Sequence, residues 1–328
     1  MSYTPPYSIT TKTVKLIAEI SEKIGAITAL SDNPLSLQLR RENRIKTIHS
    51  SLAIESNTLS IQQITDIIDG KRVLGAPDEI QEVKNAVEAY KLLLQLNPNN
   101  EKDLLRAHRL MTADLVKLNG KYRNGGVGIF DGTKVIHVAP PAMRVPELMA
   151  DLFSWLKNSD EHPLIKSCVF HYEFEFIHPF EDGNGRMGRL WQTVILKHWK
   201  PVFAWIPVET LVKQHQKEYY DALNFTLTNA NSTQFIEFML HLLNTEIDNI
   251  INRQKVTVKV TVKVTVNQQK IISAIQENPY ITQSELAENI GITLKSIKSN
   301  MKKLQDEGFI RRIGADKNGY WEITQTHP

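Results

Sequence analysis

Apolar residues recur every three or four positions through most of residues 8–253, and the runs are separated by clusters of Gly, Pro and Asn. This spacing is typical of amphipathic helices. It predicts helices near 8–26, 35–56, 61–69, 79–96, 101–117, 144–157, 161–177, 185–199, 208–228 and 232–252. The body of the chain is therefore expected to be mainly α.

Two segments depart from the helical period. Residues 125–137 carry Asp131-Gly132 between β-prone runs, which signals a β-hairpin, and Pro140-Pro141 closes it. Residues 255–266 alternate Val with Thr or Lys, a period of two that predicts one strand or two short ones. We place a domain boundary at this β-strand linker, residues 253–266.

Beyond the linker, the pattern predicts three short helices at 269–277, 282–290 and 293–307, then strands at 308–313 and 319–323. Thr282-Gln-Ser-Glu285 is a capping box, and Gly291 ends the second helix. This order resembles a winged helix-turn-helix module. The expected domains are an N-terminal helical region (1–100), a helical core (101–252) and the winged helix (267–328).

Composition places the chain among soluble globular proteins. Of its 328 residues 41% are hydrophobic and 23% charged, and no apolar run approaches the ~20 residues that a membrane helix needs. The single cysteine, Cys168, has apolar neighbours and is expected to be a small buried side chain rather than a nucleophile. With no signal-peptide pattern at the N-terminus, we expect a cytoplasmic protein without a membrane partner.

Charge separates the two ends of the chain. The net charge is +3, but residues 253–328 hold 12 basic and 7 acidic residues while residues 1–252 hold 27 and 29. Most of the excess lies in the linker, because residues 267–328 hold 8 basic and 7 acidic residues. DNA binding by the winged helix is therefore supported only weakly, and a protein partner or a homodimer contact through it stays open. The residues suited to DNA are Lys295, Ser296, Lys298, Ser299, Asn300, Lys302, Lys303, Arg311 and Arg312.

The densest set of reactive residue types is His178-Pro-Phe-Glu-Asp-Gly-Asn-Gly-Arg-Met-Gly-Arg189. Pro179 disfavours helix at the residue before it, so His178 should stand at the mouth of a loop. Gly183-Asn184-Gly185 forms a turn just before a helix, which is a site for anions. Arg186 and Arg189 share a face of that helix and can reach one polyanion.

Metal and proton chemistry fit the same segment. Asp182 supplies a hard oxygen ligand of the kind that holds Mg²⁺ together with phosphates and waters. His178, with an ordinary pKa of about 6.5, can take a proton from a hydroxyl that attacks phosphorus. Together these residues predict phosphoryl or nucleotidyl transfer. Taken alone, His178 and Asp182 are also compatible with simple capping of the helices before and after the loop.

The segment matches without departure the motif of the Fic family, His-Pro-Phe-x-(Asp/Glu)-Gly-Asn-Gly-Arg-x-x-Arg. The resemblance implies the helical Fic fold and transfer of AMP from ATP to a Ser, Thr or Tyr hydroxyl of a protein, with pyrophosphate released. It implies His178 as general base, Phe180 as the anchor of the loop and Asp182 as the Mg²⁺ ligand. The hairpin becomes the flap that aligns the target by strand addition. Nucleotide contacts are implied for Gly183, Asn184, Gly185, Arg186, Met187, Gly188 and Arg189, the last of them on the γ-phosphate.

A second resemblance lies upstream. Ser51-Leu-Ala-Ile-Glu-Ser-Asn57 is similar to the family's inhibitory helix motif, (Ser/Thr)-x-x-x-Glu-(Gly/Asn), and departs from it at Ser56. Ser51 and Glu55 share a helix face. A carboxylate on Arg189 would take the guanidinium that the γ-phosphate needs. An ordinary pair on a helix surface is the alternative.

The adenine and ribose contacts are less explicit. By resemblance to related proteins, His215 and Tyr220 are candidate nucleotide contacts, and a partly exposed helix face is the alternative reading. His108 and His171 are expected to be structural histidines. Two other functions remain open, a nucleotide-sensing DNA-binding transcription regulator and a hydrolase that removes AMP, and the protein that accepts AMP could be the chain itself.

Overall fold

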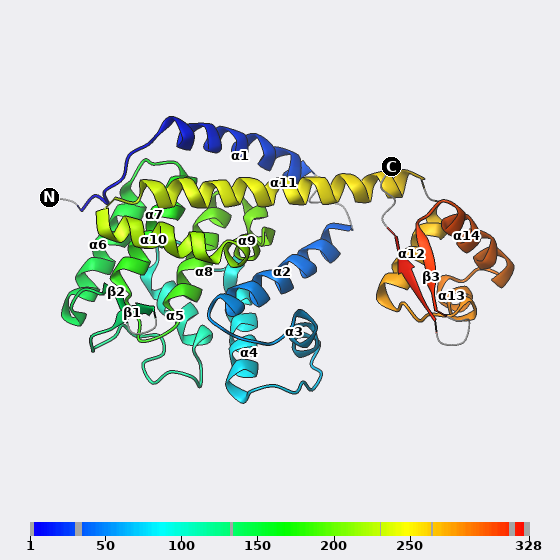
Figure 1. The fold of residues 1–328 in the computed structure, drawn as a ribbon, viewed down its shortest axis with the longest axis horizontal. Coiled ribbons are helices and arrows are strands. Elements are labelled where there is room, and N and C mark those ends of the chain that lie inside the picture. The colour runs from blue at the N-terminus through cyan, green and yellow to red at the C-terminus, as the bar shows by residue number, and fades with distance from the viewer. Residues whose placement is uncertain are drawn as a thin grey trace. The chain divides into compact units, whose positions relative to one another are not determined.

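The computed structural model describes residues 3–29, 35–131, 134–229, 231–263, 265–314 and 319–324. It divides into two compact units, Met1–Ile251 and Asn252–Pro328. The first unit is mainly α, as predicted (Figure 1). Among the described residues, no helix combines the length and the apolar character needed to cross a membrane.

The helices follow the predicted order closely. They are α1 (Thr11–Ala29), α2 (Leu35–Ile54), α3 (Ile61–Ile68), α4 (Pro77–Lys91), α5 (Glu101–Met111), α6 (Val145–Asn158), α7 (Pro163–Ile177), α8 (Asn184–Trp199), α9 (Val208–Gln214), α10 (Gln216–Asn229) and α11 (Thr233–Lys263), with the 3-10 turns η1 (Leu92–Leu94), η2 (Ala142–Arg144) and η3 (Pro201–Trp205). The single helix expected at 208–228 is divided at His215 into α9 and α10.

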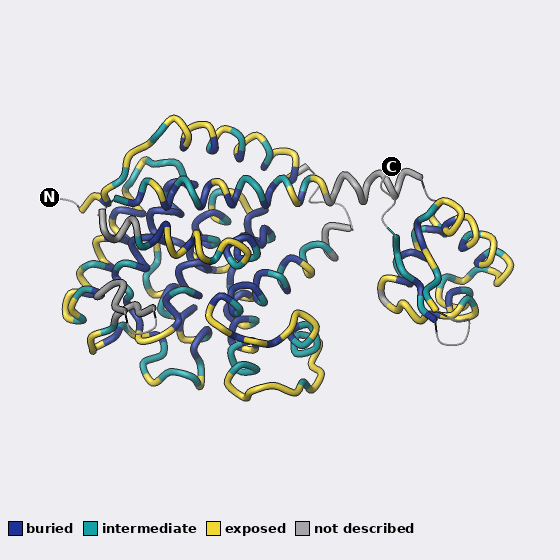
Figure 2. The backbone as a smooth tube through the Cα atoms, in the orientation of Figure 1, coloured by how far each residue is buried: buried dark blue, intermediate teal, exposed yellow. Residues whose placement is uncertain are grey.

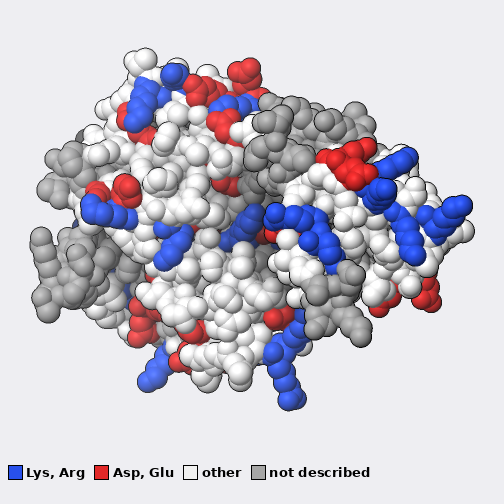
Figure 3. Space-filling model, turned by 45° about the vertical axis from the view of Figure 1, so that its right-hand side comes forward, with Lys and Arg blue, Asp and Glu red and all other residues white. Residues whose placement is uncertain are grey.

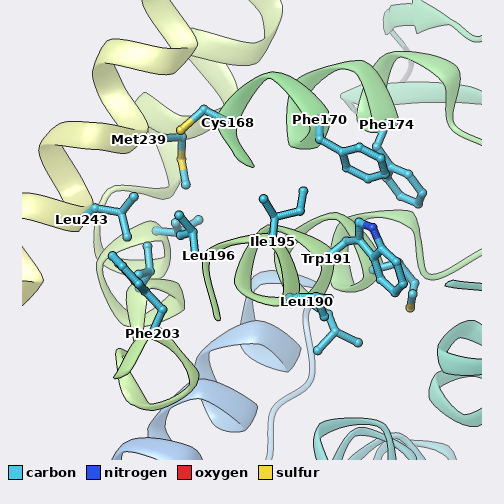
Figure 4. Close-up of a cluster of buried hydrophobic side chains, with 14 of the residues drawn as sticks. Cys168, Phe170, Phe174, Leu190, Trp191, Ile195, Leu196, Phe203, Met239 and Leu243 are labelled. Carbon is cyan, nitrogen blue, oxygen red and sulfur yellow. The ribbon is translucent and has the colours of Figure 1, made fainter. Parts of the chain in front are cut away.

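Helix α7 is buried along most of its length (Figure 2). Its apolar residues occur on all sides, which is typical of a helix surrounded by others. Figure 4 shows Phe170 and Phe174 of α7 beside Trp191 of α8. Phe153 of α6 meets both Phe170 and Trp191 edge to face, at centroid distances of 5.5 and 6.2 Å. This packing fixes α8, whose first turn belongs to the predicted site.

The predicted hairpin is present. Strands β1 (Gly128–Asp131) and β2 (Lys134–Val138) are antiparallel, with Gly128 opposite Val138. We call residues 128–138 the flap hairpin. Residues 132 and 133, which include the glycine of the expected turn, lie outside the described residues.

The second unit has the predicted helix and strand order. It contains α12 (Val266–Glu277), α13 (Gln283–Ile290), α14 (Leu294–Asp306) and the antiparallel strands β3 (Ile310–Ile313) and β4 (Tyr320–Ile323). The capping box is confirmed, since Glu285 N–H donates to Thr282 Oγ1 at 3.2 Å and Thr282 N–H to Glu285 Oε2 at 2.7 Å. Gly291 ends α13 with a φ of 74°. Most of the predicted wing turn, residues 315–318, lies outside the described residues.

The predicted strand at 255–266 is wrong. Helix α11 continues to Lys263, and α12 begins at Val266. A lone strand leaves its backbone groups without partners, whereas a growing helix pairs its own. The boundary between 1–100 and 101–252 stays a prediction, and one continuous hydrophobic cluster runs from Leu16 to Ile250 across it.

Candidate functional site

The loop between α7 and α8 has the predicted ends. Helix α7 stops at Ile177, and His178 follows in the left-handed region with φ 49° and ψ 60°. Gly183 caps α8 with a φ of 81°, and Met187 N–H donates to its carbonyl at 2.9 Å. The turn that precedes α8 therefore lies at a helix N-terminus, where backbone N–H groups and the helix dipole favour an anion.

The side chain of Asn184 closes this loop on itself. Its Oδ1 accepts from Phe180 N–H and its Nδ2 donates to the Phe180 carbonyl, both at 2.9 Å. Phe180 is fully buried and stacks on His108 with ring centroids 3.6 Å apart. The loop is thus held by its own amide pair and by a core aromatic.

His108 on α5 positions the loop from outside the motif. Its Nδ1 accepts from Gly120 N–H at 2.8 Å, so Nε2 carries the proton and donates to the Asp182 carbonyl at 3.0 Å. Burial lowers the pKa of His108 to about 4, which keeps the ring neutral. The sequence identified His108 only as a structural histidine, because nothing in its neighbourhood shows that it contacts a loop 74 residues away.

Asp182 and Arg186 form an ion pair within the motif. Asp182 Oδ2 accepts from Arg186 Nη2 at 2.9 Å, and Oδ1 accepts from Gly183 N–H at 2.6 Å. The Asp182 side chain is 58% exposed, so solvent and ligands reach it. Arg186 also donates to Glu82 Oε1 at 3.2 Å, a contact that sequence reasoning missed.

Arg189 is occupied by the segment that resembles the inhibitory motif. Its Nη2 donates to Glu55 Oε1 at 2.8 Å and to the Ser51 carbonyl at 3.0 Å, and its Nε donates to Ser51 Oγ at 3.3 Å. Burial lowers the pKa of Arg189, but the nearby Glu55 carboxylate outweighs this and the net pKa is raised. Arg189 therefore stays charged inside the fold.

The Glu55 carboxylate also lies over the glycine turn. A methyl group added at Gly185 would collide with Glu55 Oε1 and meet Arg189 Nη1 at 3.0 Å. An acidic group thus already stands against the N-terminus of α8 and beside its arginine. These are the surroundings in which a phosphate oxygen is stabilised.

The turn after α2 explains why the inhibitory motif has Gly or Asn at the position that Ser56 holds here. Ser56 has a φ of 72°, a conformation that Gly and Asn adopt more readily than Ser. Asn57, one residue later, donates to Glu82 Oε2 at 2.7 Å. Lys213 Nζ donates to the Ala53 carbonyl at 2.6 Å and so caps the end of α2. The backbone of Glu55 is therefore held by Lys213 before it and by Asn57 after it.

His178 lies next to a buried carboxyl group. Its Nδ1 is 3.9 Å from Glu175 Oε2, and the His178 side chain is 20% exposed. Burial raises the pKa of Glu175 to about 8, with Arg189 opposing the shift and Glu55 adding to it. His171, on the other side of Glu175, is kept neutral by burial, which lowers its pKa to about 3. His171 is a satisfied structural histidine, bonded to Gln192 Oε1 at 2.8 Å and Tyr219 Oη at 3.0 Å.

The structure places Tyr220 near the site, whereas nothing in the described contacts places His215 there. Tyr220 is 37% exposed, and the charges of Glu55 and Arg189 act on it, so it lies near the site. His215 lies between α9 and α10 with its Nδ1 3.7 Å from Glu218 Oε1. Their contact with a nucleotide stays a prediction.

Met187 and Gly188 have a clear packing environment. Met187 is fully buried, and a methyl group at Gly188 would lie 2.6 Å from Glu175 Oε1. The glycine therefore lets α7 and α8 approach closely. Nucleotide contact by either residue stays a prediction as well. Cys168 is fully buried, as predicted, and burial raises the pKa of its thiol to about 12.

The charges on the surface differ from the buried charges of the motif. On the face drawn in Figure 3, Lys and Arg are interspersed with Asp and Glu among the residues it colours. The two arginines of the motif, Arg186 and Arg189, instead have side chains that are each 3% exposed. The described residues hold no group of three or more His, Cys, Asp or Glu that could bind a metal ion unaided.

Comparison with known proteins agrees with the motif. The family model described as Fic/DOC family matches residues 95–196, and the one described as winged helix-turn-helix DNA-binding matches residues 265–311. The protein adenylyltransferase Fic of Aedes aegypti is 28% identical over 250 residues, 71% of this chain and 47% of that protein. That of Nematostella vectensis is 27% identical over 246 residues, 71% of this chain and 55% of that protein. The chain spans about half the length of these relatives.

Solved structures extend the likeness to the whole chain. A Fic domain containing signaling protein from Bacteroides thetaiotaomicron shares the fold of the larger part, with a TM-score of 0.61 at 19% identity over 75% of this chain and 98% of that one. A Fic family protein from Desulfovibrio desulfuricans G20 is 46% identical, with a TM-score of 0.76 over 99% of this chain and 100% of that one. This chain therefore belongs to the Fic/DOC family and carries a C-terminal winged helix-turn-helix region.

Proposed function

We propose that the chain is a protein adenylyltransferase, which transfers AMP from ATP to a Ser, Thr or Tyr hydroxyl of a protein and releases pyrophosphate. The observation that carries this proposal is the carboxylate of Glu55 lying against Gly185 and Arg189. An anion site at a helix N-terminus, next to a histidine, suits a nucleotide phosphate chain. The related adenylyltransferases support the same reaction.

In this proposal the chain's own residues divide the work. The turn at Gly183, Asn184 and Gly185 receives the phosphates, and Arg186 and Arg189 neutralise them. His178 takes the proton of the target hydroxyl as its oxygen attacks the α-phosphorus. The bond from this phosphorus to the bridging oxygen then breaks, and the pyrophosphate carries away the electron pair.

Magnesium fits the donor set. Asp182 is the hard oxygen ligand, more than half exposed at 58%, and one carboxylate with substrate phosphates and waters is a common way to bind Mg²⁺. The bound ion supplies positive charge that offsets the charge of the phosphates. Arg186 holds the Asp182 carboxylate in place from within α8.

We further propose that Glu55 inhibits the enzyme. A γ-phosphate needs the guanidinium that Glu55 and Ser51 now occupy, so ATP meets a competing carboxylate. Lys213 caps the end of α2 and Asn57 anchors the turn that follows, so the backbone of Glu55 is held opposite Arg189. Removing the carboxylate should release the activity.

The test compares two full-length proteins, Glu55→Gly and the double variant Glu55→Gly/His178→Ala, incubated with α-labelled ATP and Mg²⁺. Label on the first protein and none on the second supports the transferase. Equal label on both would overturn the role of His178. If the chain instead removes AMP with Glu55 orienting a water, an AMP-modified protein loses its AMP with wild type and keeps it with Glu55→Gly.

As a second candidate function of a different class, we propose that the C-terminal unit binds DNA. The match to a winged helix-turn-helix DNA-binding family and the exposed Lys295, Lys298 and Lys302 on one face of α14 favour contact with DNA phosphates. The wing is less available, because Arg311 pairs with Glu322 and Arg312 lies over the ring of Trp321. A gel shift that weakens with salt and with Lys298→Glu supports DNA binding. The absence of a shift at low salt would favour a protein partner for this unit instead.

A further inference from the structure

Arg123 is a buried cation in the segment that precedes the flap hairpin. It is 4% exposed, and burial lowers the pKa of its guanidinium. No residue pattern in the sequence distinguishes it from other arginines, and it lies 55 residues before His178. The structure nevertheless joins these two residues directly.

The guanidinium of Arg123 bonds the end of α7. Its Nε donates to the His178 carbonyl at 2.8 Å, and its Nη2 donates to the Ile177 carbonyl at 3.3 Å. The backbone N–H of Arg123 adds a bond of 2.9 Å to the Pro179 carbonyl. Carbonyls at a helix C-terminus have no partner within the helix, so a cation there both satisfies them and complements the helix dipole.

The same guanidinium bonds both ends of the flap hairpin. Its Nη1 donates to the Gly125 carbonyl, before β1, at 2.9 Å, and its Nη2 donates to the Pro140 carbonyl, after β2, at 2.6 Å. Between these points Ala139 N–H donates to the Val127 carbonyl at 3.3 Å and continues the pairing of the strands. One rigid fork of donors therefore connects the base of the flap to the backbone of His178.

His178 has a reason to need this support. A non-glycine residue in the left-handed region is strained and persists only where its surroundings enforce it. Pro179 cannot donate a backbone hydrogen bond that would help to hold the turn. Arg123 bonds to the carbonyls of Ile177, His178 and Pro179, and these bonds hold His178 in its strained conformation.

We propose that Arg123 is a positioning residue that makes the flap hairpin and the backbone of His178 one mechanical unit, so that a target segment aligned by the flap is also aligned with the base. The inference rests on the proposed function for its kinetic consequence, but the coupling itself is a property of the fold. A misplacement of about 1 Å is enough to lower a rate about 100-fold. The ATP contacts on α8 are not touched by Arg123.

The test uses Arg123→Met, which keeps the length of the side chain and removes the fork, in the full-length Glu55→Gly protein. Arg144→Met is the matched control, because Arg144 follows the flap in η2 but its side chain is 58% exposed. Hydrogen exchange is followed in residues 124–141 and 177–182, with α1 as the internal reference. We expect about tenfold faster exchange in both segments of Arg123→Met, unchanged exchange in α1, and no change in Arg144→Met.

The kinetic readout separates positioning from binding. Arg123→Met should lower kcat for AMP transfer about 100-fold and leave the KM for ATP within about threefold, with Arg123→Lys between it and the parent. Faster exchange in one segment alone, an equal change in α1, or an unchanged kcat in a folded variant would overturn the proposal. If Arg123→Met does not fold, Arg123→Lys decides by the same readouts. Absence of labelling in the parent Glu55→Gly contradicts the proposed function, while hydrogen exchange still decides the coupling.

Discussion

Glu55 Oε1 lies 2.8 Å from Nη2 of Arg189, which joins the end of α2 to the first turns of α8 across 134 residues of sequence. Arg189 is almost fully buried and Glu55 is about one third exposed, at 32%. A buried arginine needs an anion, and the chain supplies one from its own N-terminal half. Whatever binds at Gly185 must compete with that carboxylate.

The first prediction concerns nucleotide affinity. Glu55→Gln keeps the size of the side chain and removes its charge, so ATP with Mg²⁺ should bind at least about tenfold more tightly than to wild type. Isothermal titration calorimetry measures this. Glu22→Gln on α1, an exposed position, is the control and should leave the Kd unchanged. An unchanged Kd in Glu55→Gln would show that the pair does not compete with the nucleotide.

The second prediction concerns the base. His178→Asn keeps a residue that tolerates the left-handed conformation, so the loop should be preserved while proton transfer is lost. In the Glu55→Gly background we expect kcat to fall by about 10² to 10⁴ with little change in the KM for ATP. Rates of label incorporation at several ATP concentrations measure both quantities. A variant that keeps the parent's kcat would exclude His178 as the base.

The third prediction concerns the strained turn after α2. Ser56→Gly should raise the free energy of unfolding by about 0.5 to 1 kcal/mol, because glycine adopts the φ of 72° without steric cost. Ser56→Ala keeps the Cβ and should not stabilise. Thermal unfolding followed by circular dichroism compares the two. Equal Tm values for both variants would mean that the turn stores no strain.

The fourth prediction concerns pH. Burial raises the pKa of Glu175 to about 8 from its ordinary 4.5, so the folded chain holds this proton where the unfolded chain has lost it. Between these values the folded state binds more protons, and the free energy of unfolding decreases as pH rises. Glu175→Gln removes this contribution. Its Tm relative to wild type should therefore increase from about pH 5 to about pH 8, and a constant difference would contradict the raised pKa.

The sequence predicted the backbone of the site well, because local rules decide it. Pro179 ends α7 at Ile177, and the glycine turn begins α8 at Asn184. The strand expected at 255–266 was wrong because a period of two in Val and Thr does not provide a partner strand. The alternation of Val with Thr or Lys could not show that α11, which begins at Thr233, would continue through this segment.

The residues that hold the site together from outside the motif were not predicted. His108 and Arg123 bond to backbone carbonyls, at Asp182 and His178. Every residue has a backbone carbonyl, so the sequence does not show which residue accepts a bond of this kind. Glu82 was missed for a related reason, since many acidic residues in a helical region could have met Arg186. Contacts of this kind follow from the packing of distant helices.

AMP transfer by this chain is tested by the intact mass of the full-length Glu55→Gly protein after incubation with ATP and Mg²⁺. We expect a species heavier by the mass of one transferred AMP group, absent from the same protein without ATP and from the Glu55→Gly/His178→Ala variant. An added protein or peptide that accepts AMP should compete with Glu55→Gly for the modification and lower the amount of modified enzyme. If neither Glu55→Gly nor an added hydroxyl-bearing protein acceptor gains this mass, the chain does not transfer AMP as proposed.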